Sequence, residues 1–218
     1  TVFTPEEIKI FKDEAFSTFS NGKRKYQQAA AYILMLNTGL RTGEVLGLLN
    51  SDIDLENRVM HLNRGVKEIS KRDGVTAEKG REVKVGKLKS ATSKRDVPLN
   101  DTAIEMILDL RNEFYFGEDS PLIPDENGDF TRPLNFRKRF YRILKASEIE
   151  TKGLHALRHT FATNLVNGIE QPDGTIKSLT SRQVADLLGH TTSEITETYY
   201  VKPVSYTHLR AHETPEHL

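Results

Sequence analysis

Residues 38–45 read TGLRTGEV, and this segment joins two stretches that have the spacing of a helix. Residues 25–37 before it are rich in alanine and leucine, and the step from Thr38 to Gly39 is typical of a helix end. Apolar residues resume helical spacing over residues 41–49. Because side chains three positions apart lie on one helix face, Arg41 and Glu44 are expected to share a face. The segment therefore predicts a helix break followed by a paired arginine and glutamate.

Other stretches have the caps or the periodicity of helices. Thr4, followed by a proline and two glutamates, is typical of a helix N-terminus, and this helix is expected to run towards Phe16. Asp101 is expected to cap a helix that ends near Phe114. Further helices are predicted at residues 134–146, 154–166, 182–188 and 194–201.

Strand patterns occupy the middle of the chain. Apolar residues alternate over residues 53–63, around residues 83–88 and near Val97, which indicates three short strands of an antiparallel sheet. Residues 67–80 are polar and punctuated by glycine, so they are expected to form a loop. The turn residues Pro172, Asp173 and Gly174 suggest a small hairpin. The predicted fold class is α+β, mostly helical, with one small three-stranded antiparallel sheet.

The composition limits the class of protein. A chain of 218 residues with 37% hydrophobic content is long enough for one sizeable core, so one domain is expected. The absence of cysteine excludes disulfides, thiolate nucleophiles and cysteine-ligated zinc, and it fits a reducing compartment, with the cytoplasm as the default. No apolar run approaches the length that spans a membrane, and residues 1–8 lack the order of a signal peptide.

The charges are balanced in number but not in position. The chain has 31 basic and 31 acidic residues, so a nucleic-acid partner must be argued from their distribution. Two stretches are locally basic, and in the second of them aromatic residues are interleaved. Their basic residues are Lys79, Arg81, Lys84, Lys87, Lys89, Lys94 and Arg95, and then Arg137, Lys138, Arg139, Arg142 and Lys145. Each stretch could follow a phosphate backbone or could simply be a solvated surface.

The last residues have a different character from the rest of the chain. Residues 204–218 read VSYTHLRAHETPEHL and show no apolar periodicity. Residues 204–214 match the in-frame translation of a sequencing-library adapter, so residues 204–218 are expected to be an artefact, with a genuine tail as the alternative. The histidines at His208, His212 and His217 are accordingly not interpreted as a metal site.

Several residues have side chains suited to phosphate chemistry, but each is weak evidence alone. Arg41 could be a surface arginine paired with Glu44, and His155 and Arg158 lie one helical turn apart, as many pairs do by chance. His190 could be a histidine at a helix C-terminus, and Tyr199 could be a core aromatic residue.

Together, and in this order, these segments resemble the tyrosine recombinase, or phage integrase, family. The resemblance runs from Thr4 to about Lys202. It rests on TGLRTGEV at residues 38–45, KSATSKRDVPL at residues 89–99, HALRHTFA at residues 155–162, LLGH at residues 187–190, and Tyr199. The agreement is specific because five separate segments match in type, order and approximate spacing. The resemblance implies the fold of a tyrosine recombinase catalytic domain over residues 1–203, without the N-terminal DNA-binding domain that family members usually carry.

The resemblance implies a phosphate site made of arginines and histidines. Arg41 and Arg158 would hold the non-bridging oxygens, because a guanidinium is planar, always charged and able to bind two oxygens at once. His155 and His190 would add donors, and His155 is also a candidate base for the tyrosyl proton. Glu44 would orient Arg41. No metal, ATP or other cofactor is expected.

The nucleophile and the general acid each have a rival nearby. Tyr199 is the expected nucleophile, with Tyr200 as the alternative, since adjacent residues on a helix point about 100° apart. Lys89 is expected to protonate the departing 5′ oxygen, with Lys87 as the alternative. The expected DNA-contacting residues are Lys87, Lys94, Arg95, Arg137, Arg139 and Arg142.

The implied function is site-specific DNA recombination, either integration or excision, through a 3′-phosphotyrosyl intermediate. The implied partners are double-stranded DNA and, in the full-length parent, three further copies that form a tetramer on DNA. A bacterial or phage-encoded protein is expected. The alternatives are an activity like that of a type IB topoisomerase and an inactive DNA-binding fragment of an integrase.

Overall fold

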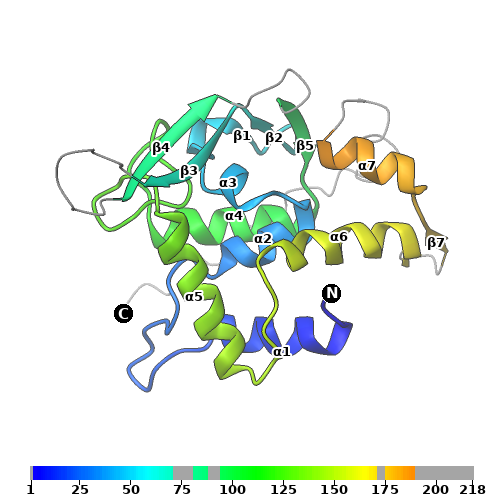
Figure 1. Cartoon of the computed structure of the whole chain (residues 1–218), viewed down its shortest axis with the longest axis horizontal. Helices are drawn as coiled ribbons and strands as arrows, with labels where there is room; N and C mark the ends of the chain where they lie inside the picture. The colour runs from blue at the N-terminus through cyan, green and yellow to red at the C-terminus, as the bar shows by residue number, and fades with distance from the viewer. Residues whose placement is uncertain (1, 71–80, 88–93, 171–174, 190–218) are drawn as a thin grey trace, which may run out of the picture.

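The computed structural model describes residues 2–70, 81–87, 94–170 and 175–189 (Figure 1). The helices are α1 (Pro5–Ala15), α2 (Ala30–Thr38), α3 (Thr42–Val45), α4 (Asp101–Glu113), α5 (Pro133–Ala146), α6 (His155–Asn167) and α7 (Ser181–Gly189), with a 3-10 turn η1 (Asn50–Asp52). The strands are β1 (Ile53–Asp54), β2 (Val59–Leu62), β3 (Arg64–Ser70), β4 (Arg81–Lys87), β5 (Arg95–Pro98), β6 (Ile169–Glu170) and β7 (Ile176–Lys177). The predicted class, α+β and mostly helical, is confirmed. No helix within the described ranges is both long and apolar enough to cross a membrane.

Helix α2 lies at the centre of the core, with α4 and α6 packed against it (Figure 1). Its first six residues are all apolar or aromatic and all buried, as expected for a helix that is covered on every side. Helices α1 and α5 join it through aromatic rings. The ring centroids of Tyr32 and Phe136 are 4.5 Å apart, and the Tyr32 hydroxyl donates to the backbone oxygen of Phe136 at 2.8 Å.

Strands β1 to β5 form two separate antiparallel units beside the helices. Strands β1, β2 and β5 make the three-stranded sheet, in which Met60 pairs with Val97. The strand predicted around residues 83–88 is not part of it, because β4 pairs with β3, opposing Val85 to Val66. The expected loop at residues 67–80 was therefore wrong for its first residues. A two-stranded ribbon is open to solvent over much of its surface, so β3 needs no regular apolar alternation, and its apolar residues Val66 and Ile69 lie three positions apart.

Helix boundaries differ from the predictions at three places. Helix α2 begins at Ala30 rather than at residue 25, after Gln28 has adopted a positive φ of 56°. Helix α3 ends at Val45, well before residue 49. The cap of α4 is Asn100 rather than Asp101, and its side chain accepts a hydrogen bond from the backbone of Ala103 at 2.8 Å. Helices α1, α5, α6 and α7 lie where they were predicted, whereas residues 194–201 lie outside the described residues.

The junction between α2, α6 and α7 is tightly packed. Gly39, the C-cap of α2, has a left-handed backbone with φ +64°. A Cβ at this position would lie 2.5 Å from side-chain atoms of both Leu188 and Phe161, so only glycine fits. Strands β6 and β7 form the small hairpin that the turn residues suggested. The close packing brings the end of α7 against the chain just before α3.

Candidate active site

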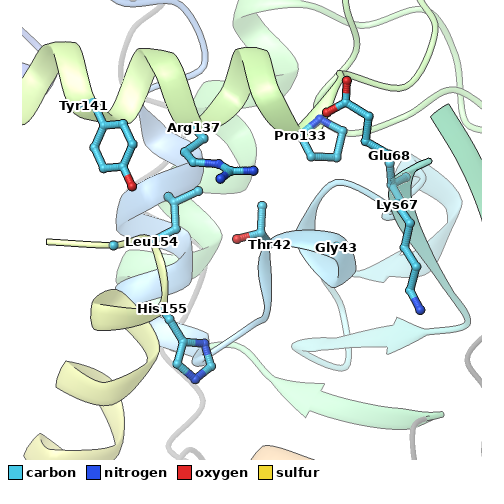
Figure 2. Close-up of a pocket in the computed structure, with 11 residues that line it drawn as sticks. Thr42, Gly43, Lys67, Glu68, Pro133, Arg137, Tyr141, Leu154 and His155 are labelled. Carbon is cyan, nitrogen blue, oxygen red and sulfur yellow. The ribbon is translucent and has the colours of Figure 1, made fainter. Parts of the chain in front are cut away.

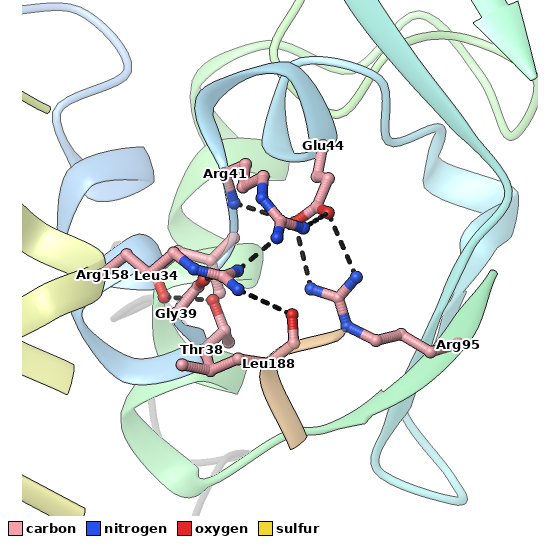
Figure 3. Close-up of polar contacts among 8 residues, drawn as sticks. All are labelled: Leu34, Thr38, Gly39, Arg41, Glu44, Arg95, Arg158 and Leu188. Carbon is pink, nitrogen blue, oxygen red and sulfur yellow. Dashed lines mark hydrogen bonds and ion pairs between the residues drawn. The ribbon is translucent and has the colours of Figure 1, made fainter. Parts of the chain in front are cut away.

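Four charged side chains from three elements meet at the start of α3 (Figure 3). Arg41 is the N-cap of α3 and Glu44 lies within it, while Arg95 comes from β5 and Arg158 from α6. The backbone N–H of Arg41 donates to Glu44 Oε2 at 2.8 Å, which fixes the first turn of the helix. The predicted proximity of Arg41 and Glu44 is present, with 2.9 Å between Nη1 and Oε1.

The Glu44 carboxylate is the centre of this cluster. Its side chain is 5% exposed, and both of its oxygens accept from Arg95, at 3.1 Å from Nη1 and 3.0 Å from Nη2. Arg158 Nη1 is 4.0 Å from Oε2. Burial raises the pKa of Glu44, but the hydrogen bonds and charge of Arg95, with those of Arg41, outweigh it and hold the pKa below the usual 4.5. Three guanidinium groups thus surround one ionised carboxylate, which leaves positive charge in excess.

Arg158 is held in a fixed orientation by two backbone carbonyls. Its side chain is 10% exposed, and Nη1 donates to Gly39 O and Nη2 to Leu188 O, each at 2.7 Å. Burial, and then the charge of Arg41, lower the pKa of Arg158 to about 10, so the guanidinium remains protonated at neutral pH. A guanidinium has five N–H donors, and two carbonyls occupy two of them. Three of its N–H donors remain beyond these two carbonyls.

Arg41 and His155 give the cluster its solvent-facing side. The Arg41 side chain is 52% exposed. His155 begins α6, one turn before Arg158, and its ring lies edge-on to that of His159 with 4.6 Å between centroids. Partial burial lowers the pKa of His155 below the usual 6.5, and the neighbouring His159, Arg158 and Arg41 lower it further. At neutral pH the imidazole is therefore mostly neutral and able to accept a proton.

A cleft of about 730 Å³ opens beside His155 (Figure 2). Its walls come from α3, β3, α5 and the start of α6. The lining residues are Thr42, Gly43, Val66, Lys67, Glu68, Pro133, Arg137, Tyr141, Gly153, Leu154 and His155. Figure 2 shows the side chains of Arg137 from α5 and Thr42 from α3 among these lining residues. Within the described part of the chain, no three histidine, aspartate or glutamate side chains gather as a metal ion would require.

The residues expected to contact DNA do not share one face. Arg137 lines the cleft, whereas Arg139, about 200° further round α5, donates to Gln28 Oε1 at 2.6 Å. Arg142 is exposed and lies about 140° round α5 from Arg137. Arg139 is thus engaged within the protein.

The expectation that Arg95 is a surface residue for DNA contact was wrong. Arg95 and Lys94 are adjacent on an extended segment, so their side chains point to opposite sides. Lys94 is exposed, and Arg95 is buried against Glu44. In the sequence, a run of basic residues does not show which of these side chains is exposed and which is buried.

The other predicted residues are not described at side-chain level. Lys87 is the last residue of β4. Lys89, His190, Tyr199 and the rival Tyr200 lie outside the described residues. The structure therefore brings together Arg41, Glu44, His155 and Arg158, and it adds Arg95 to them.

The chain belongs to the phage integrase family, whose sequence pattern matches residues 2–205. It is 29% identical, over 97% of its length, to "Tyrosine recombinase XerC-like" of Caldanaerobacter subterraneus subsp. tengcongensis. It is 28% identical, over 84% of its length, to "Tyrosine recombinase XerC" of Chlorobaculum tepidum. The chain spans about half the length of these curated relatives, covering 56% and 47% of them.

Solved structures share the fold. The integrase of transposon Tn1549, in complex with circular intermediate DNA, has a TM-score of 0.65 at 20% identity, covering 94% of this chain and 63% of that one. The catalytic core of lambda integrase has a TM-score of 0.56 at 17% identity, covering 87% of this chain and 91% of that one. The resemblance stated from the sequence and the fold it implied are both confirmed.

Proposed function

We propose that this chain is the catalytic domain of a site-specific recombinase that cuts and rejoins DNA through a 3′-phosphotyrosyl link at Tyr199. The observation that carries the proposal is the convergence of Arg41 and Arg158 on one buried carboxylate, Glu44, beside a neutral His155. Arg41 and Arg158 are far apart in sequence, and only the fold brings them together. Membership of the phage integrase family supports the same reading.

The arginines supply the charge that the reaction needs. When a phenol attacks a phosphodiester, negative charge spreads over the non-bridging oxygens of the transition state. Donors that are already fixed in place stabilise this charge without reorganising. Arg158 is fixed by Gly39 O and Leu188 O, and Arg41 by Glu44, so both present their remaining N–H groups in defined directions.

The proton transfers are assigned to neighbouring groups. A phenol with an ordinary pKa of about 10 needs a base near it. His155 takes the Tyr199 proton, the Tyr199 oxygen bonds to phosphorus, and the bond from phosphorus to the 5′ oxygen breaks. Lys89, with Lys87 as the alternative, gives a proton to that oxygen, and His190 adds a donor to the phosphate. The phosphotyrosyl bond keeps the energy of the broken phosphodiester, so rejoining needs no ATP.

The cleft is the proposed path of the DNA backbone next to the cut. Arg137 would bind a phosphate there, and the exposed Lys94 would contact the backbone beyond it. A relative in fold, the lambda integrase, was solved as a tetramer bound to a Holliday junction, with a TM-score of 0.55 at 18% identity. We assign double-stranded DNA as the partner, a tetramer on DNA to the full-length parent, and residues 1–203 to the catalytic domain. The bacterial relatives support a cytoplasmic setting.

Covalent trapping tests the proposal. A library of nicked duplexes of random sequence, in which the nick lets the 5′ fragment escape, is incubated with the chain and then denatured. We expect a denaturation-resistant adduct that Tyr199→Phe abolishes and Tyr200→Phe retains. An adduct that survives Tyr199→Phe, or no adduct at all, would contradict the proposal. Relaxation of supercoiled plasmid without any joined product would instead assign a topoisomerase activity.

A further inference from the structure

We propose that Arg95 is a positioning residue of this site, which holds and neutralises the Glu44 carboxylate so that Arg41 and Arg158 remain available to a phosphate. The inference rests on the proposed function. In this role Arg95 does not contact the DNA, and it acts only through Glu44.

The burial of Arg95 excludes a direct contact with substrate. Its side chain is 4% exposed, and its two terminal nitrogens are both used by the two Glu44 oxygens. Its Nε is buried and has no hydrogen-bond partner among the described residues. A buried ion pair with an unsatisfied donor gives little net stability, because desolvation offsets the attraction. The effect of Arg95 on the Glu44 carboxylate therefore explains the presence of an arginine here better than stability does.

The effect follows from how Glu44 shares its oxygens. Oε1 accepts from Arg41 and Arg95, and Oε2 accepts from the Arg41 backbone and from Arg95. Without Arg95, two acceptor positions of a buried carboxylate would be empty. Of the residues that the structure describes, the nearest donors that could fill them are those of Arg41 and Arg158, and Arg158 Nη1 lies only 4.0 Å from Oε2. Both guanidiniums would then turn inward, and the excess of positive charge would fall.

A lysine could not substitute fully for Arg95. Two parallel N–H donors match two carboxylate oxygens, whereas an ammonium acts as a point charge. Arg95→Lys therefore keeps the charge and loses the bridging geometry. Arg95→Lys therefore separates the effect of the charge from the effect of the two-oxygen geometry.

The pH dependence gives a readout that a purely structural role would not change. Burial raises the pKa of Glu44, and Arg95 is the largest influence that lowers it, with Arg41 next. Among the described residues, Arg158 is the remaining charged group that faces it, at 4.0 Å. In Arg95→Met the pKa of Glu44 must rise, so the carboxylate becomes neutral at a higher pH than in the original chain. Once it is neutral, it no longer attracts Arg41 and Arg158, and the cleavage defect should shrink as the pH falls.

The experiment compares cleavage rates in the adduct assay for the original chain, Arg95→Met, Arg95→Lys, Glu44→Gln and the Arg95→Met, Glu44→Gln double variant. We expect Arg95→Met to slow cleavage about 100-fold, the size of effect seen when one stabilising donor is lost. The double variant should cleave about tenfold faster than Arg95→Met, since the unpaired charge has been removed. Arg95→Lys should fall between the original chain and Arg95→Met. DNA affinity should change much less than the cleavage rate, because a duplex is bound through several phosphate contacts and Arg95 affects only those of Arg41 and Arg158.

Arg24→Met is the matched control. Arg24 also forms a bidentate ion pair, in which Nη1 and Nη2 each lie 2.6 Å from a carboxylate oxygen of Asp109. This pair lies outside the site. This variant should lose stability and keep its cleavage rate per folded molecule. The proposal fails if Arg95→Met behaves as Arg24→Met does, or if Glu44→Gln brings no recovery in the double variant.

A second measurement separates this inference from the proposed function. Inorganic phosphate should raise the thermal midpoint of the original chain at constant ionic strength, lose this effect in Arg95→Met, and regain part of it in the double variant. If the original chain forms no Tyr199-dependent adduct but shows this pattern, the proposed function fails and the role of Arg95 stands. If phosphate protects all variants equally, the role of Arg95 is refuted.

Discussion

At Glu44, one carboxylate determines the arrangement of three guanidinium groups. It fixes Arg41 through both backbone and side chain, binds Arg95 with two hydrogen bonds, and lies 4.0 Å from Arg158. Because these groups come from α3, β5 and α6, the carboxylate also ties three elements together. The Glu44 carboxylate thus helps to set the directions in which the N–H groups of the arginines point.

Replacing Arg158 by lysine tests this view of the donors. A lysine can satisfy only one of Gly39 O and Leu188 O well, so Arg158→Lys should lower the free energy of unfolding by about 1–3 kcal/mol. Cleavage should fall by about 10²–10³-fold, because the two-oxygen geometry is lost. Arg41→Lys, at a half-exposed position, should slow cleavage with a smaller loss of stability. Urea unfolding and the adduct assay measure the two effects, and unchanged cleavage by Arg158→Lys would refute the assignment.

At the scale of elements, α3 and β3 approach each other backbone to backbone. A Cβ added at Gly43 would lie 2.7 Å from Val66 O, and one at Gly47 would lie 2.9 Å from Arg64 O. Such distances leave no room for a methyl group. The ribbon of β3 and β4 is thereby held against the helix that carries Arg41 and Glu44, and the same contact forms one wall of the cleft.

Gly43→Ala should therefore separate the ribbon from α3. We expect a loss of about 1–3 kcal/mol in the free energy of unfolding, as for overpacking in a core, together with slower cleavage. Gly86→Ala is the control, because apart from its chain neighbours no heavy atom in the described part of the chain lies within 4 Å of a Cβ at that position of β4. Its effect should stay within about 0.5 kcal/mol. Equal unfolding free energies for the two variants would show that the close approach of Gly43 to Val66 O does not contribute to stability.

At the scale of the whole molecule, the chain has no net charge and yet presents positive charge where the proposed reaction takes place. The 31 basic residues are balanced by 31 acidic ones, but Arg41, Arg158 and Arg137 gather around the candidate site and its cleft. Binding to DNA should then depend on a few localised contacts, because no broad field surrounds the molecule.

Salt dependence measures how many such contacts form. The logarithm of the DNA affinity should fall linearly with the logarithm of the salt concentration, and Arg137→Ala should reduce the slope by about 0.9, the share of one phosphate contact. Arg142→Ala, about 140° round α5 from Arg137, should leave the slope nearly unchanged. Fluorescence anisotropy with a mixed-sequence duplex measures this. A larger change in slope for Arg142→Ala than for Arg137→Ala would contradict the proposed path of the DNA.

Local patterns predicted the parts of the site that are close in sequence. The three-residue spacing of Arg41 and Glu44 and that of His155 and Arg158 each placed two groups on one helix, and the structure has them there. The β3 strand was missed because its exposed ribbon lacks alternation, and Arg95 was misassigned because a run of basic residues does not tell which side chain points inward.

The sequence by itself determined the helices, their principal breaks and the family, because capping, periodicity and motif order are local properties that the chain carries before it folds. Only the tertiary structure decided that Gly39 O, Leu188 O and Glu44 gather around Arg158, and that Arg95 turns inward to Glu44. Those contacts join residues that are up to 119 positions apart, and they depend on how α2, α6, α7 and β5 pack together, which no local pattern specifies.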